Sequence, residues 1–142
     1  MRCAAFSLLL LCGLAVRPAA AQTMSVDDYW RLTKARLTVA AAEWQDRITS
    51  AQQANGDRQR LLAGSAAVTK QYAPKYNQVF VDFGMSQDMY LHFPSEHASE
   101  VESYLEDNTD FKLELDALQQ NIKSLMDTFD AIAGPILSGE SR

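Results

Sequence analysis

Two histidines and two glutamates lie within nine consecutive residues, and these side-chain types bind zinc and iron in proteins. His92, Glu96 and Glu100 would share one face of an uninterrupted helix. Pro94 lies between the first two of them, where a proline ring distorts a helix. His97 also precedes Glu100 by three residues, the reverse of the Glu-x-x-His order used by di-iron bundles. The pattern therefore predicts no metal site and no cofactor, and it leaves His92, Glu96, His97 and Glu100 as the alternative set of metal ligands.

The stretch after Pro94 is strongly acidic, and Lys112 is the only lysine or arginine between Glu96 and Asp116. Acidic side chains four residues apart on a helix repel one another and cost about 0.2–0.5 kcal/mol per pair. Glu96 with Glu100 and Glu102 with Glu106 have this spacing, so the acidic run does not stabilise its own helix. Its members are Glu96, Glu100, Glu102, Glu106, Asp107, Asp110, Glu114 and Asp116.

The two halves of the chain carry opposite charge, which allows two interpretations of the acidic run. Residues 22–78 carry eight basic and five acidic side chains, whereas residues 79–142 carry three basic and thirteen acidic ones. In the first interpretation the basic residues Arg31, Lys34, Arg36, Arg58 and Arg60 compensate the acidic helices internally. In the second, the surplus charge forms a docking face for a basic protein partner. The residues predicted to contact that partner are Glu100, Glu102, Glu106, Asp107 and Asp110.

Aromatic residues gather near Pro74 and Pro94, the two prolines expected to disturb helices. Most aromatic residues of this chain fall on apolar stripes, where core packing is the simpler role. Broken helices also leave unpaired backbone groups and local cavities, so this region is where we expect a pocket for a peptide or an apolar ligand. The predicted groove residues are Tyr72, Tyr76, Tyr90 and Phe93.

Motifs that carry out catalysis are missing from the sequence. Ser65 and Ser86 lie beside or near glycines, but neither falls on a strand-to-helix turn, which excludes a nucleophile elbow. The sequence also contains no glycine-rich phosphate-binding loop. We therefore assign no catalytic residue and predict a protein that is not an enzyme.

Apolar residues recur at spacings of three and four in four segments, which predicts an all-α fold. The first segment runs from a Ser25 cap to Asn55-Gly56, and the second from Asp57 to Gly84 with a kink near Pro74. The third runs from Ser86 to Asn108 and is expected to break at Pro94-Ser95. The fourth runs from a Thr109 cap to Gly134-Pro135. Short connections favour an antiparallel up-down bundle of four helices, and the near alternative is a three-helix body with a broken third element.

The N-terminus has the pattern of a cleaved secretory signal peptide. Arg2 precedes an apolar run from Cys3 to Val16, and small residues at 19–21 form the expected cleavage site. The predicted organisation is a signal peptide at 1–21, a helical domain at 22–135 and a flexible tail at 136–142. Cleavage removes both cysteines, so the mature chain is predicted to contain no disulfide. We expect a periplasmic or secreted protein without stable membrane insertion.

The charge of the mature chain restricts the class of partner. Removing the signal leaves 11 basic side chains against 18 acidic ones, a net charge of −7. Nucleic acids and anionic membranes bind Lys- and Arg-rich surfaces, so neither is expected. The leading hypothesis is a non-enzymatic binding protein with a basic protein partner, in an inhibitor, immunity or chaperone-like role, and homo-oligomerisation stays open. The alternative is a helical carrier of a metal ion or a small apolar ligand near residues 92–100.

Overall fold

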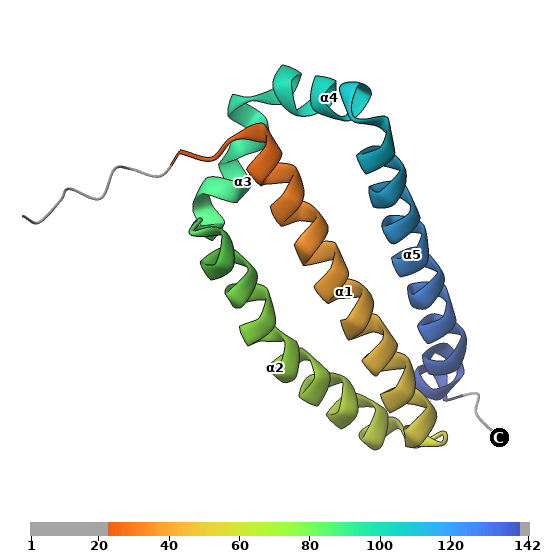
Figure 1. Cartoon of the computed structure of the whole chain (residues 1–142). Coiled ribbons are helices and arrows are strands. Elements are labelled where there is room, and N and C mark those ends of the chain that lie inside the picture. The colour runs from red at the N-terminus through yellow and green to blue at the C-terminus, as the bar shows by residue number, and fades with distance from the viewer. Residues whose placement is uncertain (1–22, 140–142) are drawn as a thin grey trace, which may run out of the picture.

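The computed structural model describes residues 23–139, and every regular element in that range is a helix. The all-α prediction is therefore confirmed for this part of the chain. The predicted signal peptide lies outside the described residues. The elements are α1 (Val26–Ala54), α2 (Arg58–Phe83), α3 (Gln87–Glu96), α4 (Ala98–Asp107) and α5 (Thr109–Ser138), as shown in Figure 1.

Three long helices form the body, with α1 lying between α2 and α5 (Figure 1). α2 runs antiparallel to α1, whereas α5 runs in the same direction as α1. The short helices α3 and α4 cross one end of the body and connect α2 to α5. α2 and α5 converge at the opposite end, where Leu61 packs with Ala133 and Ile136. Five helices in this arrangement differ from the predicted up-down bundle of four and are closer to the three-helix alternative.

Capping residues set most of the helix ends where the sequence places them. Ser25 and Asp28 form a reciprocal capping box at the start of α1, and Asn55 ends that helix in the left-handed conformation with φ of 48°. Asp57 caps α2, and Gly84 ends it with φ of 64°. The Ser86 side chain accepts the hydrogen bond of the Met89 backbone N–H at the start of α3.

α2 is one helix through Pro74, as expected for the second segment. Three other predicted boundaries or breaks need correction. α3 continues through Pro94 to Glu96, so the interruption falls at His97. A proline inside a helix removes one backbone hydrogen bond, and α3 ends two residues after Pro94. Asn108 rather than Thr109 occupies the cap of α5, with no side-chain cap bond.

α5 also continues beyond Gly134-Pro135 to Ser138, with Gly139 as its cap. Ile136 is 7% exposed and packs with Ala133 against Leu61, so burial holds the last turn in the helix. The predicted tail is therefore helical from 136 to 138, and residues 140–142 lie outside the described part.

Two apolar clusters stabilise the body at its opposite ends. One joins α1 and the end of α2 to α3, and the other joins α1, the start of α2 and the end of α5. Leu32 is completely buried in the first cluster, although the three-and-four spacing through Trp30, Thr33 and Leu37 that predicts this helix does not include it. α1 is buried on two sides because it packs between two helices, so a single stripe underestimates its core. Among the described helices, none combines the length and apolar character needed to cross a membrane.

Candidate functional site

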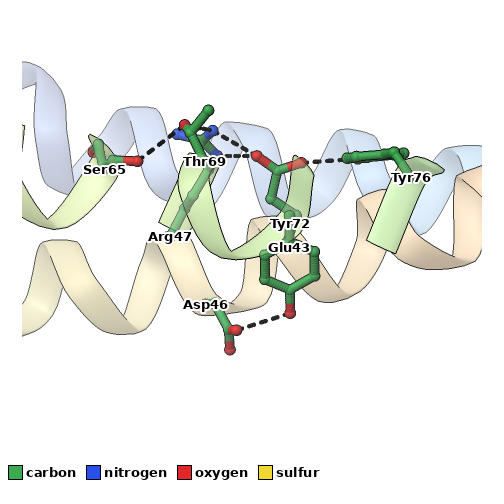
Figure 2. A network of polar contacts seen from close by, with 7 residues as sticks. All are labelled: Glu43, Asp46, Arg47, Ser65, Thr69, Tyr72 and Tyr76. Carbon is green, nitrogen blue, oxygen red and sulfur yellow. Dashed lines mark hydrogen bonds and ion pairs between the residues drawn. The ribbon is translucent and has the colours of Figure 1, made fainter. Parts of the chain in front are cut away.

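A polar network links α1 to α2 (Figure 2). Arg47 donates to Oε1 of Glu43 from Nε at 3.0 Å and from a terminal nitrogen at 2.5 Å. Tyr76 donates to the second carboxylate oxygen of Glu43 at 2.8 Å, and Tyr72 donates to Asp46 at 2.8 Å. Glu43 and Asp46 belong to α1, and the two tyrosines belong to α2. The tyrosine hydroxyls thus connect the two helices.

Burial and the neighbouring carboxylates suppress ionisation of these two tyrosines. Desolvation is the larger cause in both cases and raises the pKa of Tyr72 to about 12 and the pKa of Tyr76 to about 12. Each hydroxyl also donates to a carboxylate, Asp46 for Tyr72 and Glu43 for Tyr76, which favours the protonated form. The two tyrosine hydroxyls thus stay protonated and donate to carboxylates of α1, which links the two helices.

A pocket of about 310 Å³ lies between α1, α2 and α3. Its α1 residues fall on one face at spacings of three and four, Tyr76 comes from α2 and Tyr90 from α3. The guanidinium of Arg36 stacks over two aromatic rings, 4.7 Å from the centroid of Tyr90 and 5.5 Å from that of Phe80. The lining residues are Thr33, Arg36, Leu37, Ala40, Tyr76 and Tyr90.

Arg36 has no acidic partner within residues 23–139. Its Nε atom is buried and makes no hydrogen bond in that part of the chain. Buried polar groups are normally bonded, so an unbonded guanidinium nitrogen calls for an explanation. The charge pattern predicts that Arg36 compensates the acidic helices, and it does not indicate this environment. The spacing of Arg36, three residues from Thr33 and four residues from Ala40, was the available signal.

The four predicted groove residues do not share one pocket. Tyr76 and Tyr90 line the pocket beside Arg36, whereas Tyr72 is buried and bonded to Asp46. Phe93 lines a different pocket of about 480 Å³ together with His92, Glu96 and His97. The tertiary arrangement thus divides the set between two pockets and the polar network.

Each candidate metal ligand with an imidazole is paired locally. His92 Nδ1 lies 2.9 Å from the backbone carbonyl of Asp88 and 3.3 Å from its carboxylate, and this backbone hydrogen bond is the main reason that the pKa of His92 is raised. His97 Nδ1 lies 3.4 Å from Glu100 and its ring stacks on Phe93. Within residues 23–139, no three His, Cys, Asp or Glu side chains are close enough together to hold a metal ion.

We use the name acidic face for the five acidic residues Glu100, Glu102, Glu106, Asp107 and Asp110, all of which are exposed. The first four belong to α4, and Asp110 lies in the first turn of α5. Glu100 pairs with His97, whereas the other four make no ion pair with any described residue. α4 is attached through Trp30, which donates to the Val101 carbonyl at 3.0 Å, and through the Tyr104 hydroxyl, which donates to Asp27 at 2.6 Å.

The basic residues of the N-terminal half contribute little compensation. Lys34 forms an ion pair with Glu114 of α5. Arg31 and Arg60 instead pair with acidic residues beside them on the chain, Asp27 and Asp57. Arg36 and Arg58 have no ion pair among the described residues. None of these five basic residues pairs with the acidic face in that part of the structure, so the face retains its negative charge.

No family of known proteins, no curated protein and no solved structure matches this chain. The fold class, all-α with three long and two short helices in the described range, therefore comes from the structure itself.

Proposed function

We propose that this protein is an exported, non-enzymatic binding protein that recognises a basic protein partner through the acidic face. The observation that supports it is the exposure of Glu102, Glu106, Asp107 and Asp110 without an ion-pair partner in residues 23–139. A negatively charged surface speeds encounter with a positively charged partner and disfavours acidic ones.

Local helix energetics oppose several of these acidic residues. Glu106 and Asp107 occupy the last turn of α4, where the helix dipole disfavours negative charge, and that turn contains no basic residue. Glu102 and Glu106 are also four residues apart, so they repel each other. Glu100 and Asp110, in contrast, lie in first turns, where negative charge is favourable. The stability of α4 itself therefore does not account for Glu106 and Asp107, which supports a role in recognition.

An inhibitor or immunity protein against a basic cell-wall hydrolase fits this electrostatic arrangement, and a small chaperone for basic clients fits it equally. Both use the same face and the same kind of partner. They differ in the state of that partner, which is folded in the first case and unfolded in the second.

The test compares two variants that change the net charge by the same amount. The first neutralises the acidic face with Glu102→Gln, Glu106→Gln, Asp107→Asn and Asp110→Asn. The second, a matched control, changes four exposed aspartates of α2 and α5: Asp82, Asp116, Asp127 and Asp130 to asparagine. Each protein is expressed with its own N-terminus, cross-linked in its native compartment and analysed by mass spectrometry.

We expect wild type and control to capture the same basic protein, and the acidic-face variant to lose at least about tenfold of it, equivalent to about 1.4 kcal/mol. Binding of the purified pair should weaken as salt rises, because exposed charges are screened. Equal capture by both variants, or capture of acidic proteins alone, would contradict the proposal.

A second candidate, a carrier near residues 92–100, is supported by the pocket of about 480 Å³ beside His92 and His97. Its metal form is tested by melting the protein with a chelator and with added zinc, since a ligand that binds only the folded state raises the melting temperature. Identical midpoints under both conditions would exclude a tightly bound zinc ion.

A further inference from the structure

We propose that the pocket around Arg36 binds a small carboxylate with an apolar body, and that the Arg36 guanidinium is its anionic anchor. This site is separate from the acidic face, because its residues come from α1, α2 and α3. Its occupant is also of the opposite charge to the partner of the acidic face.

The hydrogen-bond donors of the pocket other than Arg36 are already committed. Thr33 donates to the backbone carbonyl of Tyr29 at 2.8 Å. Its hydroxyl oxygen therefore accepts the proton of Tyr90 across their 3.0 Å contact. Tyr76 donates to Glu43. The guanidinium of Arg36, with five N–H groups, is the group in this lining that still has donors to offer.

The charge around the pocket also favours an anion. None of the lining residues is acidic. Glu43 approaches through its bond to Tyr76, but both of its oxygens are bonded and Arg47 balances its charge. Arg36 has no such acid, so its positive charge is uncompensated within residues 23–139. A carboxylate can accept two N–H groups of a guanidinium in the same plane, which a neutral ligand cannot match.

The other residues that line the pocket indicate that the rest of the ligand is apolar. Leu37 and Ala40 from α1, the Tyr76 ring from α2 and the Tyr90 ring from α3 provide an apolar surface in this pocket. Pockets of this kind hold small molecules by apolar contact and orient them with a few polar groups. The aromatic rings already hold Arg36 in place, so its orientation costs less on binding.

The test uses phenylacetate as the probe and phenylacetamide as its neutral match, with isothermal titration calorimetry and thermal melting on residues 22–142. Arg36→Met removes the charge and keeps the length of the side chain. Ala40→Leu fills the pocket and leaves the charge. Arg31→Met is the matched control, because Arg31 lies on the same helix, is exposed and pairs with Asp27.

We expect saturable binding of phenylacetate to wild type and to Arg31→Met, with a raised melting temperature. Phenylacetamide should bind at least about tenfold more weakly, as should phenylacetate to Arg36→Met and to Ala40→Leu. Circular dichroism verifies the fold of each variant, and Ala40→Leu alone decides the question if Arg36→Met does not fold. Absence of phenylacetate binding, equal affinity for acid and amide, or full affinity in a folded pocket variant would overturn the proposal. None of these outcomes depends on the acidic face.

Discussion

Tyr76 donates a 2.8 Å hydrogen bond from its hydroxyl to Oε2 of Glu43, and so connects α2 to α1 through a carboxylate that Arg47 already holds. The position of Glu43 is thus set from both helices (Figure 2). The same tyrosine forms one wall of the pocket beside Arg36. The structural network and the proposed ligand site therefore share one side chain.

We expect Tyr76→Phe to lower the free energy of unfolding by about 1 kcal/mol, near the net value of a hydrogen bond at a partly buried site. The measurement is urea denaturation. In a double-mutant cycle with Glu43→Gln, the two changes should couple by about 0.5–1 kcal/mol. Simple additivity of the two changes would mean that this hydrogen bond does not contribute to stability.

Alkaline pH should destabilise the protein through Tyr72 and Tyr76. Their pKa values rise from 10.0 to about 12 on folding, so the folded state retains protons that the unfolded state loses. Their contribution is complete below pH 10 and is lost as the pH rises towards 12. The double variant Tyr72→Phe/Tyr76→Phe should show a shallower loss of melting temperature across this range. A profile as steep as that of wild type would contradict the assignment.

Leu32→Ala should destabilise the protein by about 2–5 kcal/mol, the usual cost of removing a fully buried leucine side chain. Leu32 is 0% exposed, whereas Leu62 on α2 is 53% exposed and provides the control. Leu62→Ala should change the free energy of unfolding by less than about 0.5 kcal/mol. Similar losses for both variants would show that Leu32 contributes no more to the core than an exposed leucine does.

Alanine substitution of the two predicted cap residues, Ser25 and Thr109, should have different effects on stability. Ser25 takes part in a capping box, so Ser25→Ala should cost about 1 kcal/mol in chemical denaturation. Thr109 is the first residue within α5 and makes no cap bond, so Thr109→Ala should change stability by less than about 0.5 kcal/mol. A larger loss at Thr109 than at Ser25 would reverse the assignment of these helix starts.

Gly64 lies at a close approach of α2 to α1. A Cβ atom there would overlap Oγ of Ser50 and stand 3.4 Å from its Cβ. In a Ser50→Ala background, Gly64→Ala should stabilise by about 0.5–1 kcal/mol, because alanine favours helix over glycine. With Ser50 present the gain should be smaller, since its hydroxyl must rotate away. Equal effects in both backgrounds, by thermal melting, would exclude this contact.

Local rules gave reliable expectations where the interaction is itself local. Ser25, Asn55, Asp57 and Gly84 bound their helices as their side chains and backbone preferences predict. The same local rules were wrong at Pro94 and Pro135, because α3 and α5 continue through these prolines. Packing of neighbouring apolar residues, such as Ile136, offsets the hydrogen bond that a proline removes.

The amino-acid sequence by itself determined the helical class, most of the caps and the concentration of acidic residues after Pro94, because all three depend on residues within a few positions of one another. Tertiary structure decided the rest. Only the packing of α1 between α2 and α5 buries Leu32, and only the meeting of α1, α2 and α3 places Tyr76 and Tyr90 beside Arg36. Contacts between distant segments depend on how helices cross, and spacing along one helix does not specify that.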